Sequence, residues 1–159
     1  CLTNRYLDFK EGQMQLTIRP LQSQDKPGWR QLWHDYLEFY ESTVGDTIYD
    51  TTFDRLLSEK HTNQNAFLAL EGTLPIGLVH YIYHPHNWKV EDVCYLQDLY
   101  AVPECRGQGI GRALIEAVYQ AADANGTPTV YWLTQDFNHT ARQLYDRVAT
   151  LTPFIKYAR

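Results

Sequence analysis

Hydrophobic positions along this chain follow two patterns, which predict a mixed α/β fold. Apolar residues spaced three and four apart predict helices, and short apolar runs between turn residues predict strands. The expected helices cover residues 25–42, 51–60, 109–124 and 138–149. The expected strands cover residues 16–19, 66–70, 76–84, 93–102, 129–134 and 153–157. This order predicts one mixed central β-sheet with helices on its faces.

Two of these helices carry the clearest stripes. In the third helix Leu114, Ala117, Val118 and Ala121 recur on one face, and Asn125-Gly126 supplies a stop signal. The first helix carries a stripe of large residues that is mostly aromatic, formed by Trp29, Leu32, Trp33, Tyr36, Leu37 and Tyr40.

Composition narrows the class of protein. The chain has 159 residues, enough for one domain with its own core, and its net charge of −5 without a basic run disfavours nucleic acid and anionic membranes as partners. No apolar stretch approaches the roughly 18 residues of a membrane span. Three scattered cysteines are not a disulfide framework, so we expect a reducing, cytoplasmic location.

The beginning of the chain lacks a clear pattern. Residues 1–13 show no period, and the single methionine, Met14, precedes a natural opening strand. We therefore expect residues 1–13 to be a tag or a disordered extension, and residues 14–159 to be a single domain.

A glycine-rich loop joins the expected strand 93–102 to the helix that follows. Such a loop before a helix N-terminus offers unpaired backbone amides and the positive end of the helix dipole, so it predicts an anion-binding site. The string required for a nucleotide P-loop is absent. The dinucleotide fingerprint fails because Arg112 stands where its third glycine belongs. A third pattern, [R/Q]-x-x-G-x-[G/A], fits Arg106, Gly109 and Gly111.

At these residues the chain resembles the GNAT superfamily of acyl-CoA-dependent N-acetyltransferases. The strand 98–103, the strand 129–134, the Ile76-Gly77 pair and the spacing of Asn138, Ala141 and Tyr145 extend the resemblance over residues 14–159. The phrases around Trp33 and Val130-Tyr131-Trp132 are similar to the histone and polyamine branch, which includes relatives acting on D-amino acids.

The resemblance implies the GNAT fold and a reaction. We expect an N-acetyltransferase that moves an acetyl group from acetyl-CoA to a primary amine by direct transfer in a ternary complex, with no metal. The acceptor could be a polyamine, an amino acid or a lysine of a protein. The alternative is a non-catalytic acyl-CoA-binding or sensor module on the same fold.

The resemblance also assigns the co-substrate site. Asn138 is expected to contact the pantetheine arm, and the guanidinium of Arg106 or Arg112 to add a charge-assisted contact. The backbone of the strand is expected to pair with pantetheine, and the loop amides to hold the pyrophosphate. These two groups are Leu99, Tyr100, Ala101 and Val102 for the strand, and Gly107, Gln108, Gly109, Ile110, Gly111 and Arg112 for the loop.

Tyr145 is the expected general acid for the departing thiolate. Its helical register places it on the apolar face, and a phenol at its usual pKa donates a proton at neutral pH. The general base is left open, because Gln97 stands where polyamine-acetylating relatives have a glutamate. A water chain to Asp98 or to Glu38 would serve, although alternation along a strand places Asp98 on the face opposite Gln97 unless a bulge intervenes.

The remaining expectations concern the acceptor, metals and assembly. Tyr36 and Tyr40 could face a cationic amine together with Gln97. The His84-Pro85-His86 sequence lacks further ligands at zinc spacing, so we expect no metal. The expected last strand, 153–157, would leave an edge to cover, so we expect a homodimer.

Overall fold

A single five-stranded sheet organises residues 15–159, the part of the chain that this computed structural model describes. The predicted extension, residues 1–13, lies outside the described residues. The strands stand in chain order, and every neighbouring pair is antiparallel except the last. The strands are β1 (Leu16–Pro20), β2 (Gln64–Glu71), β3 (Leu74–His84), β4 (Val93–Ala101) and β5 (Val130–Tyr131).

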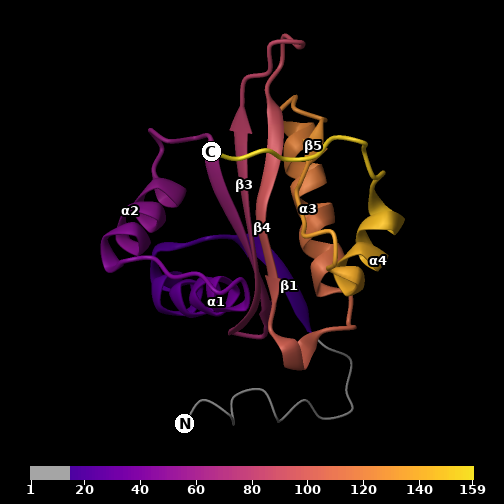
Figure 1. Cartoon of the computed structure of the whole chain (residues 1–159). Coiled ribbons are helices and arrows are strands. Elements are labelled where there is room, and N and C mark those ends of the chain that lie inside the picture. Colours follow the sequence, from indigo (N-terminus) through magenta and orange to yellow (C-terminus); the bar gives the residue numbers. More distant parts are fainter. Residues whose placement is uncertain (1–14) are drawn as a thin grey trace.

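Helices cover both faces of the sheet (Figure 1). On one face α1 packs on β3 and β4, and α2 packs on β2; on the other face α3 crosses β1 to β4, with α4 beside it. The helices are α1 (Lys26–Phe39), α2 (Asp46–Leu57), α3 (Ile110–Ala124) and α4 (His139–Val148), and short 3₁₀ turns cover Ser23–Asp25 and Pro103–Cys105. No helix in the described range is long and apolar enough to cross a membrane.

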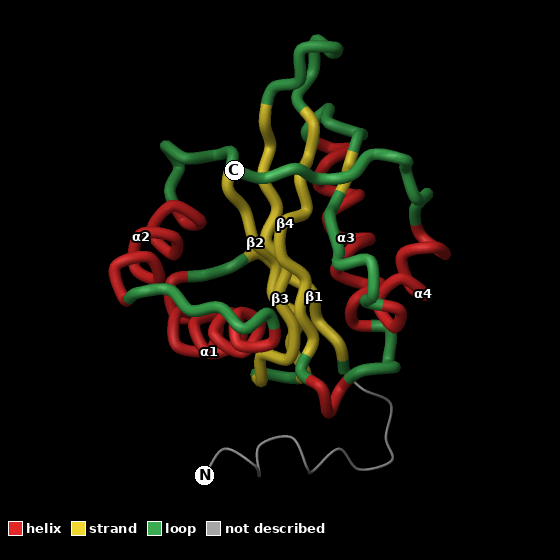
Figure 2. Tube along the Cα trace, viewed as in Figure 1, coloured by secondary structure: helices red, strands yellow, loops and turns green. Residues whose placement is uncertain are grey.

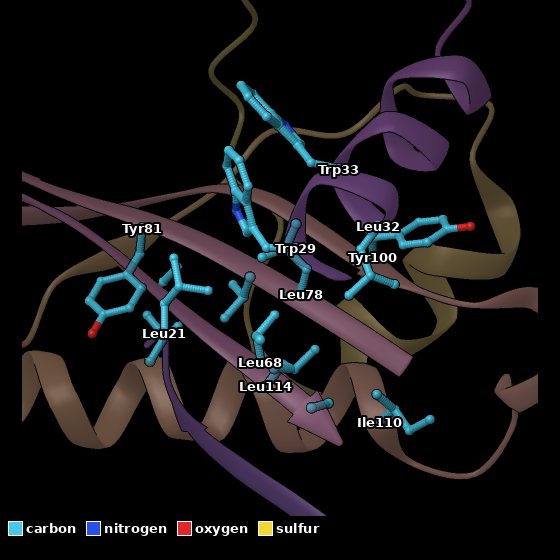
Figure 3. Close-up of a cluster of buried hydrophobic side chains, with 14 of the residues drawn as sticks. Leu21, Trp29, Leu32, Trp33, Leu68, Leu78, Tyr81, Tyr100, Ile110 and Leu114 are labelled. Atoms are coloured by element: carbon cyan, nitrogen blue, oxygen red, sulfur yellow. The ribbon is translucent and has the colours of Figure 1, made fainter. Parts of the chain in front are cut away.

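The core fills both sides of the sheet (Figure 3). Trp29 and Leu32 of α1 are fully buried against one face, and Leu114 of α3 is fully buried against the other. Removing this apolar surface from water is the main stabilising contribution. The stripes predicted for the first and third helices therefore face the sheet as expected.

The sheet is incomplete along one edge of β4. β3 pairs with β4 as far as Ala101, whereas β5 pairs with it only at Cys94 and Tyr95. After Tyr131 the chain turns away, and Trp132 packs its ring against Tyr145, with centroids 5.4 Å apart. Within the described chain, the pairing of β4 with β5 therefore ends at Tyr95.

Three expected boundaries were wrong. The strand expected at 129–134 shrinks to β5, for the reason just given. The first helix ends at Phe39 rather than at residue 42, because Glu41 takes a left-handed backbone conformation (φ 54°). The second helix begins at Asp46, where Gly45 is the N-cap and the aspartate favours the first turn.

The strand expected at 153–157 is also absent, and Figure 2 shows that segment as loop. Its apolar side chains are largely exposed: 80% for Phe154 and 77% for Ile155. A strand needs a partner for its backbone hydrogen bonds, and these residues pair with no strand of the described chain.

Candidate functional site

The glycine loop has the geometry of an anion cradle. Gly107 and Gly109 have φ angles of 79° and 80°, a conformation that glycine adopts without steric cost. Gly109 is the N-cap of α3, and Ala113 N donates to its carbonyl over 3.0 Å. The preceding amides, from Gly109 to Arg112, lack intrahelical acceptors and carry the positive end of the helix dipole.

The residues around this loop hold it against the sheet. Ile110 is buried where Gly77 of β3 leaves room: a Cβ on Gly77 would lie 2.9 Å from Ile110 Cγ2. At Gly111 a Cβ would lie 3.2 Å from Leu144 Cδ2 of α4. These two close approaches place the start of α3 between β3 and α4, whereas Gln108 is exposed.

The two arginines of the loop differ in their contacts. Arg106 Nε donates to Ala101 O over 3.1 Å, and its guanidinium lies 5.8 Å from the ring centre of Tyr100. Arg112 Nε lies 2.9 Å from Glu116 Oε1 on the exposed side of α3. Arg106 therefore fastens the loop to the end of β4, and a phosphate contact by either side chain stays a prediction.

The open edge of β4 leads from the loop towards the middle of the sheet. Val102 is an exception among the four residues predicted to pair with pantetheine, because its N–H donates to Ile76 O (2.9 Å) and its carbonyl accepts from Cys105 N (3.0 Å). Since successive amides of a strand point to opposite edges, the amides of Leu99 and Ala101 point to the open one. The amide of Tyr100, like that of Val102, points to β3. Pairing of Leu99 and Ala101 with pantetheine stays a prediction.

A β-bulge brings Gln97 and Asp98 to the same pocket. Asp98 pairs with His80 and Leu96 pairs with Tyr81, so Gln97 is the extra residue of β4. This bulge is the exception under which the two side chains were not expected to lie on opposite faces. The pocket has a volume of about 180 Å³ and lies between α1, α2 and strands β2 to β4. Its lining residues are Trp33, Thr52, Leu56, Gln64, Asn65, His80, Tyr81, Ile82, Gln97 and Asp98.

A buried chain of hydrogen bonds ends at Asp98. Trp29 Nε1 donates to His80 Nε2 over 2.9 Å, and His80 Nδ1 lies 2.8 Å from Asp98 Oδ2. Trp29, His80 and Asp98 are 0%, 4% and 9% exposed. Sequence reasoning missed His80, although a histidine inside an apolar strand is a signal, because a buried polar ring needs partners.

Tyr36 of α1 and Tyr40, the C-cap residue of this helix, lie near both Asp98 and α4. Burial raises the pKa of Tyr36 above its usual value, and the neighbouring Asp98 carboxylate raises it further. The two tyrosine rings lie 5.0 Å apart. Burial also raises the pKa of Tyr40, the Asp98 carboxylate raises it further, and the Asn138 side chain lowers it. Neither tyrosine lines the pocket, so contact with an acceptor amine stays a prediction.

Tyr145 is positioned beside the same tyrosine pair. Burial raises its pKa to about 12, and Tyr40 adds to the increase. Asn138 occupies the N-cap of α4 without capping it, and its Nδ2 donates instead to Thr134 Oγ1 over 3.4 Å. Tyr145, Asn138 and Asp98 thus all lie in the neighbourhood of Tyr40. The roles assigned to these three residues stay predictions.

Glu38, the alternative base, lies away from the pocket. Its side chain is 64% exposed and pairs with His34 over 3.5 Å. His34 and Asp35, which are half-buried, form a cluster on α1 with the exposed Glu38, and one polar atom of each lies within 4.8 Å of the others. The ring nitrogens of His84 contact Pro85 O and Tyr131 Oη, at 2.9 and 2.8 Å.

Comparison with known proteins agrees with this geometry. The D-amino-acid N-acetyltransferase HPA3 of Saccharomyces cerevisiae is 38% identical over 146 residues, covering 91% of this chain and 90% of that protein. The thialysine N-epsilon-acetyltransferase of Bos taurus is 35% identical over 75 residues, 47% of this chain and 44% of that protein.

Solved structures share the fold at low sequence identity. The aminoglycoside N-acetyltransferase AAC(6')-Iy in complex with CoA has a TM-score of 0.81 at 17% identity, covering 94% of this chain and 97% of its own. A ribosomal-protein-alanine N-acetyltransferase from Brucella melitensis has a TM-score of 0.72 at 19% identity, covering 91% and 98%. Residues 29–149 match the Acetyltransferase (GNAT) family, and the chain therefore belongs to this family of acetyltransferases.

Proposed function

We propose that this protein transfers an acetyl group from acetyl-CoA to the primary amine of a small amino acid, by direct attack in a ternary complex. The observation that carries the proposal is the continuity of the site. The anion cradle at α3, the open edge of β4 and the pocket at Gln97 and Asp98 follow one another along a single strand. Coenzyme A would supply the acetyl group as an activated thioester.

The residues present fit coenzyme A. Its pyrophosphate is an anion, and the amides from Gly109 to Arg112 are donors without intrahelical acceptors. Its pantetheine arm carries amides, which match the open backbone edge at Leu99 and Ala101. We assign the pyrophosphate to the loop, the arm to this edge, and a further contact to Asn138.

Asp98 would accept a proton from the acceptor amine, and Tyr145 would donate one to the leaving group. An acceptor ammonium gives one proton to Asp98, directly or through a water, and the neutral nitrogen then attacks the acetyl carbon. As the new C–N bond forms and the C–S bond breaks, Tyr145 protonates the leaving sulfur. The nitrogen's surplus proton restores the phenol, and the proton on Asp98 passes to solvent. The pKa of about 12 keeps Tyr145 protonated at neutral pH, as a donor requires.

The pocket favours an amino acid over a polyamine. Asp98 is the only carboxylate among its lining residues, so it offers one site for an ammonium group and none for a second. Gln64, Asn65 and Gln97 provide amide groups that can donate to a carboxylate. A D-amino-acid acetyltransferase among the relatives supports the same class.

Gln97 is the feature that favours the alternative, a non-catalytic acyl-CoA sensor, because an amide cannot accept the amine's proton. The buried Asp98 beside it supports catalysis instead. We further propose that residues 14–159 form a single domain; the one sheet formed by strands between residues 16 and 131 supports this. A cytoplasmic location agrees with two free, buried cysteines, Cys94 and Cys105.

Release of coenzyme A with a panel of D- and L-amino acids, polyamines and a basic peptide tests the function. We expect kcat/KM to be highest for an amino acid, because the pocket offers one carboxylate and several amides. A polyamine as the best acceptor would contradict the proposed class. Binding of acetyl-CoA without turnover across the panel would favour the sensor.

Tyr145→Phe is expected to lower kcat about a hundredfold, the scale of losing a general acid, with little change in the KM for acetyl-CoA. Tyr119→Phe is the matched control, because it also removes the hydroxyl of a half-buried tyrosine. The Tyr119 hydroxyl, on α3, donates to Val148 O of α4 over 2.9 Å. That change should lower stability by about 1 kcal/mol and leave kcat unchanged. Equal kcat in Tyr145→Phe and wild type would remove Tyr145 from the mechanism.

Gly109→Ala is expected to weaken coenzyme A binding about tenfold or more, because an alanine at φ 80° costs roughly 1–2 kcal/mol and shifts the amides. Gly126→Ala is the control: it also has positive φ (73°) and open space, but lies beyond the other end of α3. Both should lower the melting temperature, and calorimetric titration should show weaker binding only for Gly109→Ala. Equal affinities would contradict the loop assignment.

We also propose a homodimer. Four apolar side chains after α4 are 72–89% exposed, namely Leu151, Phe154, Ile155 and Tyr157, and burial against a second copy would remove them from water. Light scattering at micromolar concentration should give twice the chain mass of 18.6 kDa. A monomer mass would contradict the proposal.

A further inference from the structure

We propose that His80 is a positioning residue for acetyl transfer: its Nδ1–H holds the carboxylate of Asp98, and Trp29 sets the tautomer of the ring that makes this possible. The inference rests on the proposed role of Asp98 as proton acceptor. Trp29 lies on α1 and His80 on β3, and neither takes part directly in the proposed proton transfer.

The hydrogen-bond partners decide where the imidazole proton lies. An indole N–H can only donate, so His80 Nε2, 2.9 Å from Trp29 Nε1, must be the acceptor. The neutral ring then carries its hydrogen on Nδ1. That hydrogen is donated to Asp98 Oδ2, 2.8 Å away. Each N–H donor of this series, on Trp29 and on His80, therefore has an acceptor.

Burial keeps the ring in this orientation. Turning the ring over would place carbon atoms against both partners and leave the indole N–H and the carboxylate without hydrogen bonds in a buried site, which is unfavourable. Trp33 also packs edge-on against the imidazole, with centroids 5.3 Å apart and planes at 82°. The surrounding aromatic side chains therefore resist rotation.

The sheet itself sets the distance to Asp98. His80 and Asp98 are directly opposed in the register of β3 and β4, immediately beside the bulge at Gln97. The backbone ladder thus sets the position of the carboxylate, and the hydrogen bond from His80 orients it. His80 does not take the amine's proton itself, because Trp29 occupies the only nitrogen that could accept it.

Two substitutions at His80 separate positioning from packing. The amide of an asparagine reaches the place of Nδ1, so His80→Asn keeps a donor for Asp98 and loses the acceptor for Trp29. A glutamine reaches the place of Nε2, so His80→Gln keeps the acceptor for Trp29 and loses the donor for Asp98. Glutamine also replaces more of the ring's volume, so a purely structural role predicts that His80→Gln is the better variant.

We expect the opposite order in kcat. His80→Asn should stay within about threefold of wild type, and His80→Gln should lose roughly tenfold to a hundredfold, the scale for removing a partner that orients a functional side chain. The KM for acetyl-CoA should change little in either variant, because the cradle at α3 is untouched. A higher kcat in His80→Gln than in His80→Asn would overturn the proposal.

The tautomer of the His80 ring gives a second readout, which can be measured first in the wild-type protein. In ¹⁵N-histidine spectra of the wild-type protein, His80 should carry its hydrogen on Nδ1, and Trp29→Phe should reduce that preference. A hydrogen on Nε2 of His80 in the wild type would contradict the proposed series of hydrogen bonds from Trp29 to Asp98. An inactive wild type would refute the proposed function. If the wild type is active and kcat is higher in His80→Gln than in His80→Asn, only the role of His80 is refuted.

Discussion

The incomplete pairing of β4 is the constraint on which the candidate site depends. β3 satisfies one edge of this strand along its whole length, and β5 satisfies the other edge for two residues. Buried backbone amides need partners, so an edge left open inside a fold is a binding surface for another chain or ligand. The chain turns away at Trp132, whose ring contacts Tyr145, so the same packing that opens the edge also positions the proposed acid.

The two ends of this open edge are built differently. At the loop, backbone geometry is decisive: glycines at positive φ and the N-terminus of α3 present amides, and few side chains are needed. At the bulge, side chains are decisive, because Gln97 and Asp98 turn towards one pocket. In the proposed assignment the co-substrate lies at the first end and the acceptor at the second, so relatives can share the first end and differ in acceptor. The relatives of this chain are named for different substrates.

The aromatic core on the α1 face has a chemical consequence. Trp29 lies within ring-contact distance of Trp33, Tyr49, Phe53 and His80. A buried polar group is tolerated in such surroundings only when its hydrogen bonds are satisfied. The stripe predicted from helical spacing as packing surface therefore also contains the donor that determines the state of a histidine beside the pocket.

The sequence by itself determined the order of elements, the two strongest helix stripes and the strand–glycine–helix unit, because these depend on local periodicity and backbone preference. It also singled out Asp98, Tyr145 and Asn138 through a motif. Tertiary structure alone decided the bulge that turns Asp98 towards Gln97, the partners of His80, and the loss of the last strand. These three features depend on which strands meet and in what register, and residues far apart in the chain supply those contacts, so local patterns carry no signal for them.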